Sequence, residues 1–185
     1  MCIRDRHMTA TLNSSGVLGI VLDNGVLFRG GQEKVSRQGY VDDDQIEAVL
    51  ALPQNLFYNT GSPGTILIFN KNKRPERKGK ILFIDASSEY EEGKAQNFLR
   101  DNNVEKIVSA FDGFADIEKF CAVVGKESIV ENDYNLNVSL YVDTSEAEPE
   151  IDVAAVNEEL KELIRQRDVS YSEMQAYLKD LGYEE

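Results

Sequence analysis

Residues 65–85, TILIFNKNKRPERKGKILFID, decide the fold. Two runs of mostly apolar residues, 65–69 and 80–85, flank a basic loop, and short apolar runs of this kind are typical of strands buried in a sheet. Parallel neighbours need a long crossover, and this loop is too short for one. We therefore predict that the two runs are antiparallel neighbours in a mixed sheet.

Further strands and helices are expected upstream of this pair. Residues 17–22 form a continuous apolar run between turn-rich segments, which predicts a strand buried on both faces. Residues 32–40 predict a weak polar helix that Gly39 should fray or end. Residues 46–52 predict another strand, which Pro53 ends. The alternation of strands and helices indicates an α/β protein.

Helical spacing takes over downstream, where Asn102 or Asn103 is available as an N-cap. The apolar residues of this predicted helix share one face: Val104, Ile107, Val108 and Phe111. Residues 120–124 predict a short strand, and residues 126–132 predict a short helix. Residues 144–152 carry four acidic residues and Pro149, which indicates a linker.

Two short amphipathic helices are predicted after the linker, interrupted at Asp168. Ser170 and Glu173 form a capping box for the second helix, and Gly182 is placed to end it. Short isolated helices are marginal in water, so their apolar stripes around Leu160 and Leu178 need cover. That cover is either the chain's own core or a partner protein.

The composition is that of a globular protein. The 185 residues contain 42% hydrophobic residues and carry a formal net charge of −13, which argues against a collagen or a largely disordered chain. No apolar run approaches the roughly 20 residues that cross a bilayer, and no signal peptide is readable, so we expect a cytoplasmic protein with no membrane contact. Two cysteines and the single His7 do not suffice for a zinc site, and no metal is expected.

The first six residues, MCIRDR, show neither hydrophobic periodicity nor turn chemistry. They resemble the translation of an adapter used in sequencing libraries, and residues 1–6 are set aside as an assembly scar. The expectation that follows is that the reading frame begins inside a longer protein. Motifs that belong upstream would then be missing from this chain.

Local motifs carry little catalytic chemistry. The sequence has no P-loop, no dinucleotide-binding glycine motif, no nucleophile elbow and no metalloprotease or EF-hand pattern. Cys121 lies in an apolar run without a basic neighbour and is predicted to be an inert buried thiol. The three aspartates at 42–44 are interpreted as a solvated turn rather than a metal or acid–base site.

Residues 55–63, NLFYNTGSP, place Phe57 and Tyr58 side by side in a loop before a strand. Adjacent side chains on extended backbone point in opposite directions, so one ring can pack inward while the other faces out. An outward ring beside a sheet is a stacking platform for a nucleic-acid base. The alternative, which the residues alone favour, is that both rings close the edge of the core.

A series of ordered blocks resembles the methyltransferase subunit of type I restriction-modification systems. The match runs from about His7 to the C-terminus and rests on NGVLFRGG (24–31), LPQNLFYNTG (52–61), ILIFNKNK (66–73), RKGKILFIDA (77–86), QNFL (96–99) and ENDYNLN (131–137). The resemblance implies an S-adenosylmethionine-dependent enzyme that methylates adenine N6 in DNA, built on a Rossmann-like sheet with an antiparallel final strand.

The glycine-rich cofactor motif and the Asn-Pro-Pro-aromatic motif of such enzymes lie upstream of the region that matches residues 17–22, and neither occurs in this sequence. The resemblance therefore implies that residues 7–143 are the C-terminal part of a methyltransferase sheet, followed by an acidic linker (144–152) and a helical tail for subunit contact (153–185). This fragment is expected to be inactive alone, with no catalytic residue and no cofactor-binding residue of its own.

The same resemblance indicates the site residues. Related enzymes hold the flipped adenine with an aromatic residue in the loop before the strand that matches residues 65–69, and by spacing this residue is Phe57, with Tyr58 as a pocket neighbour. Asn24 follows the first strand at its carboxyl end, where ligands collect in open α/β sheets. The alternative for Asn24 is an ordinary Asn-Gly turn.

The acidic charge is unexpected for a DNA-binding protein, because phosphate contacts favour a basic surface. The resemblance accounts for it, since a separate specificity subunit reads the sequence, two methyltransferase subunits surround the double-stranded DNA, and a restriction subunit completes the complex. The local basic run either touches phosphate or is a solvated loop: Lys71, Lys73, Arg74, Arg77, Lys78 and Lys80. The alternative function is a non-catalytic interaction module that retains only the partner-binding helices.

Overall fold

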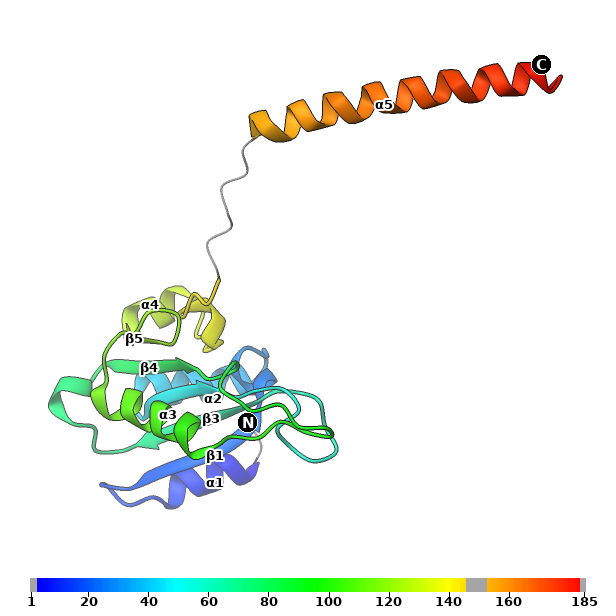
Figure 1. The fold of residues 1–185 in the computed structure, drawn as a ribbon. Coiled ribbons are helices and arrows are strands. Elements are labelled where there is room, and N and C mark those ends of the chain that lie inside the picture. Colours follow the sequence, from blue (N-terminus) through cyan, green and yellow to red (C-terminus); the bar gives the residue numbers. More distant parts are fainter. Residues whose placement is uncertain (1–2, 146–152, 184–185) are drawn as a thin grey trace. The chain divides into compact units, whose positions relative to one another are not determined.

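The computed structural model describes residues 3–145 and 153–183. The chain forms two compact units that divide after Ser145, and each is described by itself (Figure 1). The boundary falls in the predicted linker at 144–152, of which residues 146–152 lie outside the described residues.

The first unit is built on a five-stranded mixed sheet with the strand order β1-β3-β2-β4-β5. β2 and β4 are parallel, and the other neighbouring pairs are antiparallel. The strands are β1 (Val17–Asp23), β2 (Ile46–Ala51), β3 (Gly64–Asn70), β4 (Lys80–Asp85) and β5 (Cys121–Gly125). The predicted α/β class and mixed sheet are confirmed.

One strand pairing was predicted wrongly. β3 and β4 run in opposite directions, but β2 lies between them, so they are not neighbours. β2 and β3 are the antiparallel neighbours, and the basic loop after β3 passes the end of β2 before β4 begins. β3 and β4 are therefore two strand spacings apart, about 10 Å, and a loop of this length spans that distance without a helix.

β1 also differs from its prediction. It lies at the edge of the sheet and pairs with β3 alone among the described strands. Ile20 is buried, whereas Val17 is 59% and Val21 48% exposed. The prediction that this strand is buried on both faces is therefore wrong, because the face that carries Val17 and Val21 is exposed in the described residues.

The first unit contains four α-helices among the described residues: α1 (Ile3–Thr11), α2 (Gln32–Asp42), α3 (Asp101–Gly113) and α4 (Lys126–Glu131). Helix α1 begins inside the segment set aside as a scar. Helix α2 runs through Gly39, which was expected to fray or end it. One glycine costs a helix only about 1 kcal/mol, so the helix continues to Asp42.

The start and the buried face of α3 differ from the prediction. Arg100 is the N-cap, and its backbone N–H donates to the Asn103 side chain at 3.0 Å, so Asn103 lies in the first turn. Ile107 and Ala110 are buried, whereas Val104 and Val108 are exposed. The predicted apolar face is therefore rotated relative to the face that contacts the sheet.

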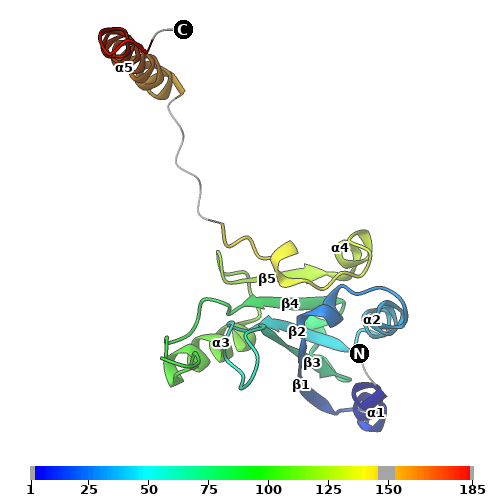
Figure 2. The same cartoon turned by 90° about the vertical axis from the view of Figure 1, so that its right-hand side faces the viewer.

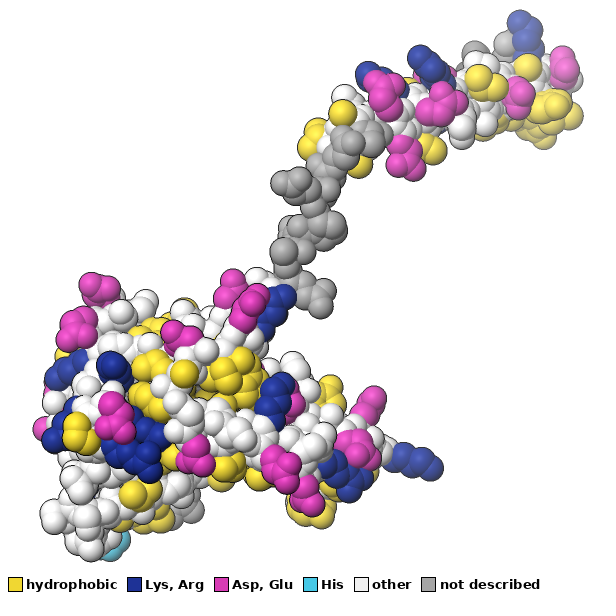
Figure 3. Space-filling view, turned by 60° about the vertical axis from the view of Figure 1, so that its left-hand side comes forward, with side chains coloured by type: hydrophobic (Ala, Val, Ile, Leu, Met, Phe, Trp, Pro, Cys, Tyr) yellow, Lys and Arg dark blue, Asp and Glu magenta, His cyan; other side chains and the backbone are white. Residues whose placement is uncertain are grey.

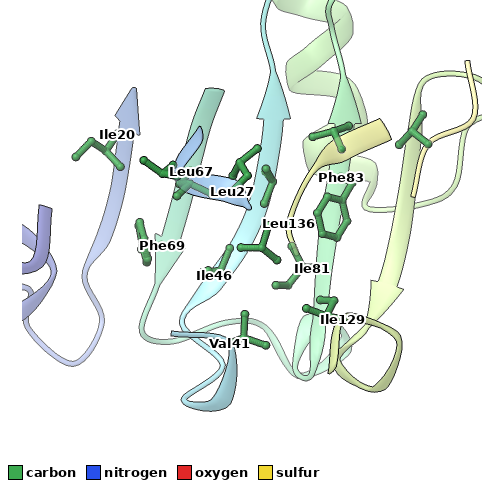
Figure 4. Close-up of a cluster of buried hydrophobic side chains, with 14 residues drawn as sticks. Ile20, Leu27, Val41, Ile46, Leu67, Phe69, Ile81, Phe83, Ile129 and Leu136 are labelled. Carbon is green, nitrogen blue, oxygen red and sulfur yellow. The ribbon is translucent and has the colours of Figure 1, made fainter. Parts of the chain in front are cut away.

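Two hydrophobic clusters sandwich the sheet. On one face, η1 (Asn24–Leu27), α2 and α4 contribute Leu27, Val41 and Ile129 to a cluster with the inner strands (Figure 4). On the other face, α3 packs over β2 and β4 through Ile107 and Ala110. Figure 2 shows α3 and α2 on opposite sides of the sheet.

A buried arginine that the sequence did not indicate joins distant segments of the first cluster. Arg37 donates to the backbone oxygens of Val26 at 2.9 Å, Arg29 at 2.8 Å and Tyr134 at 3.1 Å. Burial lowers the pKa of its guanidinium from the usual value, and the charges of Glu33 and Asp133 oppose this shift. Arg37 thus ties α2 to the turn after β1 and to the ENDYNLN block.

The described part of the second unit forms a single helix, α5 (Val153–Asp180), of 28 residues, so the prediction of two short helices is wrong. Asp168 stays in the helix, and its backbone oxygen accepts a bond from the Ser172 hydroxyl at 2.9 Å. Neither Asp168 nor Val169 costs enough helix propensity to interrupt it. Gly182 follows the helix with a φ of 76°, as expected for a glycine that ends one.

The apolar side chains of α5 are exposed in the described unit (Figure 3). They lie at helical spacing along its length and include Val156, Leu160, Leu163, Met174 and Tyr177. None of the described helices has the length and apolar content needed to cross a bilayer.

Candidate functional site

Three strands end at one edge of the sheet, called here the carboxyl rim. β1 and β2 both run antiparallel to β3, and β4 runs parallel to β2, so Asp23, Ala51 and Asp85 lie at this rim. Gly64, the first residue of β3, pairs with Asp23 there. Ligands bind preferentially beyond such an edge in open α/β sheets.

The aromatic loop lies at the carboxyl rim, between β2 and β3. Phe57 is half-buried, and its ring lies over Gly64, where an added Cβ would be only 2.7 Å from Phe57 Cε2. Tyr58 is 82% exposed. One ring therefore packs inward and the other faces out, and the interpretation that both rings close the core is wrong.

Phe57 lines a pocket of about 320 Å³ at this rim, called here the rim pocket. Its walls come from the end of β1 and from the loop before β3: Val21, Leu22, Asp23, Phe57, Thr60, Ser62, Pro63 and Gly64. The ring also borders a second hollow that Tyr58 and Gln96 line. A pocket with few polar groups and an aromatic wall suits a flat heterocycle.

Two asparagines set the shape of the loop. Asn55 has a φ of 54° and Asn59 a φ of 63°, so both adopt the left-handed conformation that asparagine tolerates better than most residues. They bracket Leu56, Phe57 and Tyr58. The loop also closes on itself, because the Asn55 backbone N–H donates to Gly61 O at 3.4 Å.

Asn24 lies near the rim pocket but is not one of its lining residues. It opens η1, whose N-cap is Asp23; the Asp23 Oδ1 accepts from the Gly25 backbone N–H at 2.6 Å and from Arg29 at 3.1 Å. The Oδ1 of Asn24 is buried and has no hydrogen-bond partner within the described residues. The Asn-Gly pair thus forms part of a 3-10 helix.

The basic run between β3 and β4 lies at the opposite edge of the sheet from the rim pocket. Lys73 is buried and donates to Asp44 at 2.6 Å and to the backbone oxygen of Lys80 at 2.9 Å. Burial lowers the pKa of the Lys73 ammonium, and the hydrogen bond to Asp44 opposes that shift. Asp42 and Asp43 are exposed in the turn before β2, as predicted, whereas Asp44 is partly buried and holds Lys73.

Arg77 is the second buried residue of the basic run. Its guanidinium pairs with Glu47 at 3.2 Å and donates to the backbone oxygen of Asp112 at 2.8 Å. Arg77 and Lys73 are therefore neither phosphate contacts nor part of a solvated loop. Lys73 pairs with Asp44 and Arg77 with Glu47. These partners are distant in the sequence, so no local pattern indicates them.

Cys121 is buried, as predicted, and its Sγ contacts the backbone oxygen of Ala115 at 3.2 Å. Burial raises the pKa of this thiol, so less thiolate is present at neutral pH than in the unfolded chain. We expect iodoacetamide to label Cys121 more slowly in the native chain than in urea, as measured by peptide mass spectrometry. Equal labelling rates in both states would contradict this prediction.

No group of metal-ligating side chains occurs within the described residues. The candidate site is the rim pocket with its aromatic wall, and the QNFL and LPQNLFYNTG blocks together form the loop that supports it. The Asn97 backbone N–H donates to Asn55 O, and its side chain donates to Gln54 O, both at 2.8 Å.

Comparison with known proteins identifies the family. The model of the N-6 DNA methylase family matches residues 5–150. The methylase subunit of the type I restriction enzyme MjaVIII of Methanocaldococcus jannaschii is 52% identical over 89% of this chain and 29% of its own length. The MpnII methylase subunit of Mycoplasma pneumoniae is 34% identical over 88% of this chain and 30% of its own length.

Solved structures agree. The methyltransferase subunit of a type I restriction-modification system from Streptococcus thermophilus has a TM-score of 0.66 and 45% identity, over 70% of this chain and 27% of that protein. The M protein of EcoKI shares the fold at a TM-score of 0.61 with 20% identity, over 98% of this chain and 44% of that protein. The chain spans about 30% of the length of the two relatives named here. It belongs to the N-6 DNA methylase family, among the methylase subunits of type I restriction enzymes.

Proposed function

We propose that this chain is the C-terminal part of a methylase subunit that transfers a methyl group from S-adenosylmethionine to adenine N6 in double-stranded DNA, and that it holds the flipped adenine. The observation that carries the proposal is the half-buried Phe57 ring, which lines the rim pocket at the carboxyl rim. A base inside a duplex is out of reach, so such an enzyme must rotate it into a pocket.

Phe57 would contribute the stacking surface for that base. Stacking on an aromatic side chain is worth about 1–3 kcal/mol per base, and it offsets part of the cost of unstacking. Holding N6 in line with the methyl donor supplies much of the rate. Tyr58, exposed beside the pocket, is available to contact the neighbouring nucleotide. Asn24, with its buried and unpaired oxygen, is a further candidate for a contact with the DNA or with another part of the enzyme.

The described residues do not fit S-adenosylmethionine. Cofactors in Rossmann-like sheets lie between the carboxyl ends of parallel strands. The one parallel pair among the described strands, β2 and β4, leads into a pocket of about 290 Å³ with no glycine in its lining, which consists of Gln54, Asn55, Ser87, Tyr90 and Asn97. The sequence also lacks the glycine-rich and Asn-Pro-Pro-aromatic motifs. We therefore assign cofactor binding to another part of the enzyme and expect this chain to be inactive alone.

The edge position of β1 supports the reading as part of a larger sheet. Val17 and Val21 are exposed on a strand whose second edge has no partner among the described strands. A further strand and a helix would cover both features in a complete methyltransferase domain.

Extending the reading frame upstream in the source DNA tests the function. The joined protein, purified with its specificity subunit, should transfer labelled methyl groups from S-adenosylmethionine to adenine in duplex DNA, whereas the 185-residue chain alone should not. A start codon and promoter directly before His7, with no methylation by the complex, would instead support the non-catalytic interaction module.

The partners are also proposals: a specificity subunit, a second methyltransferase subunit and a restriction subunit. We propose that α5 contacts the specificity subunit, because Leu160 and Leu163 are exposed on one helix face. The double change Leu160→Asp and Leu163→Asp should abolish co-purification with that subunit. Glu158→Gln, on the charged surface of the same helix, should leave it intact. Unchanged binding of the double variant would exclude this face as the contact.

A further inference from the structure

We propose that Asn97 and Gly64 are positioning residues that hold the Phe57 ring in the rim pocket before DNA binds, an inference that rests on the proposed base-stacking function of Phe57. Gly64 leaves space for the ring. Asn97 fixes the start of the loop that carries it.

The absence of a side chain at Gly64 permits the ring position. A Cβ at residue 64 would lie 2.7 Å from Phe57 Cε2, closer than real Cβ contacts allow. The backbone here is fixed, because Gly64 pairs with Asp23 and its oxygen accepts from the Leu52 N–H at 3.0 Å. A methyl group at this position must therefore displace the ring rather than the strand.

Asn97 fixes the start of the loop through two hydrogen bonds. Its backbone N–H donates to Asn55 O and its side-chain Nδ2 donates to Gln54 O, both at 2.8 Å. Asn97 is only 9% exposed, so water does not readily replace these bonds. These two bonds hold Gln54 and Asn55, which directly precede Leu56 and Phe57. They therefore set the direction in which the loop leaves β2 and, with it, the position of the ring.

Asn97 is itself held by a closed segment, residues 86–100, called here the brace. Glu91 and Phe98 exchange two backbone hydrogen bonds of 2.9 Å, which close the brace into a hairpin. Arg100 then binds both carboxylate oxygens of Glu91 at 2.8 Å. This hydrogen bonding lowers the pKa of the Glu91 carboxyl, so the pair persists to a more acidic pH than it would with an unshifted glutamate.

A ring that is already in place matters because binding loses free energy when a loop or side chain must become ordered. If the loop moved freely, base flipping would have to order it each time. Loss of Asn97 or Gly64 should therefore raise the KM for DNA and weaken base flipping, while the binding of S-adenosylmethionine stays unchanged.

The chain has no tryptophan, so Phe57→Trp gives a single fluorescent reporter at the site. In this background, we expect Gly64→Ala and Asn97→Asp each to shift the emission to the red and to raise acrylamide quenching toward that of a free tryptophan amide. Asn97→Asp keeps the size of the side chain but removes the N–H group that donates to Gln54 O. Circular dichroism and the Tm check that each variant is folded.

Two control variants match these changes away from the loop. Gly113→Ala adds a Cβ that meets no atom within 4 Å, and Asn132→Ala removes a side-chain bond of 2.9 Å to Ser128 O. Both should leave the emission unchanged. A tryptophan that stays equally shielded in Gly64→Ala and Asn97→Asp, or that is exposed in the controls too, overturns the proposal.

The same two changes in the full-length enzyme separate this inference from the proposed function. A shifted fluorescence with unchanged KM and base flipping would show that the residues hold the ring but that the ring does not bind the base. Unshifted fluorescence with reduced base flipping would show that the two residues affect base binding without holding the ring, which overturns this inference.

Discussion

Replacing Phe57 by alanine in the full-length enzyme should lower kcat/KM for DNA methylation by about 5- to 150-fold. This range is the value of one base stack, about 1–3 kcal/mol, expressed as a rate ratio. The physical reason is that the flipped adenine loses the aromatic wall of the rim pocket, which Phe57 supplies from above Gly64. Methylation of duplex DNA and the fluorescence of an adenine analogue at the target position measure the two effects.

A matched change separates stacking from packing. Phe57→Leu keeps an apolar side chain against Gly64 but removes the aromatic face, so it should lose nearly as much base flipping as Phe57→Ala while retaining more stability. Phe57→Tyr should retain both. Normal flipping signals in Phe57→Ala, or full activity in Phe57→Leu, would remove this residue from the base-binding role.

The second large effect concerns stability. Arg77→Met should destabilise the chain by about 3–5 kcal/mol, because it leaves a buried carboxylate without its cation. The side chain of Glu47 is only 4% exposed, and Asn70 is its remaining hydrogen-bond partner, at 2.9 Å. The guanidinium also lies over the rings of Phe114 at 4.6 Å and Phe111 at 5.2 Å, contacts that the variant replaces with weaker ones. Urea denaturation followed by circular dichroism measures the loss.

A double variant tests the cause. Arg77→Met with Glu47→Leu removes both charges and should regain most of the stability, since apolar pairs often replace buried ion pairs at little cost. Arg74→Ala, in the same loop but exposed, should have little effect on stability. If the double variant is as unstable as Arg77→Met, the loss comes from packing against the two rings instead of from the unpaired charge.

Local patterns in the sequence were sufficient to locate the strands. All five predicted strands occur, because runs such as residues 80–85 are short, apolar and bounded by turn residues. Their order was not predictable to the same degree. The pairing of β2 between β3 and β4 depends on contacts across the sheet, and the length of a loop sets only an upper limit on the distance between its ends.

The helical errors have local causes. The Ser170 and Glu173 spacing fits a capping box, but a helix that already runs through Asp168 gains nothing from ending there. At α3, the apolar pattern includes Val104 and Val108, which stay exposed, and omits the small Ala110 that lets the helix approach the sheet. Alanine carries little weight in such patterns because it occurs equally on both faces of helices.

The candidate site could be predicted only in part. The pair Phe57 and Tyr58 was identified from the sequence, and the structure shows that Phe57 lines the rim pocket while Tyr58 faces out. Asn97 was missed as a site residue, because it acts through two backbone oxygens that lie more than forty positions away. The QNFL block contained the signal, but the residues alone do not say which segment it holds.

The position of β1 has a consequence for handling the isolated chain. Its outer edge pairs with no other strand in the described part of the chain, Val17 and Val21 lie exposed on it, and strand edges of this kind recruit other strands. In concentrated solution, we expect the outer edge of β1 to pair with the same edge of another molecule. Self-association of the purified polypeptide would then reflect an unshielded border of the sheet, and it would carry no information about the complex proposed for the full-length enzyme.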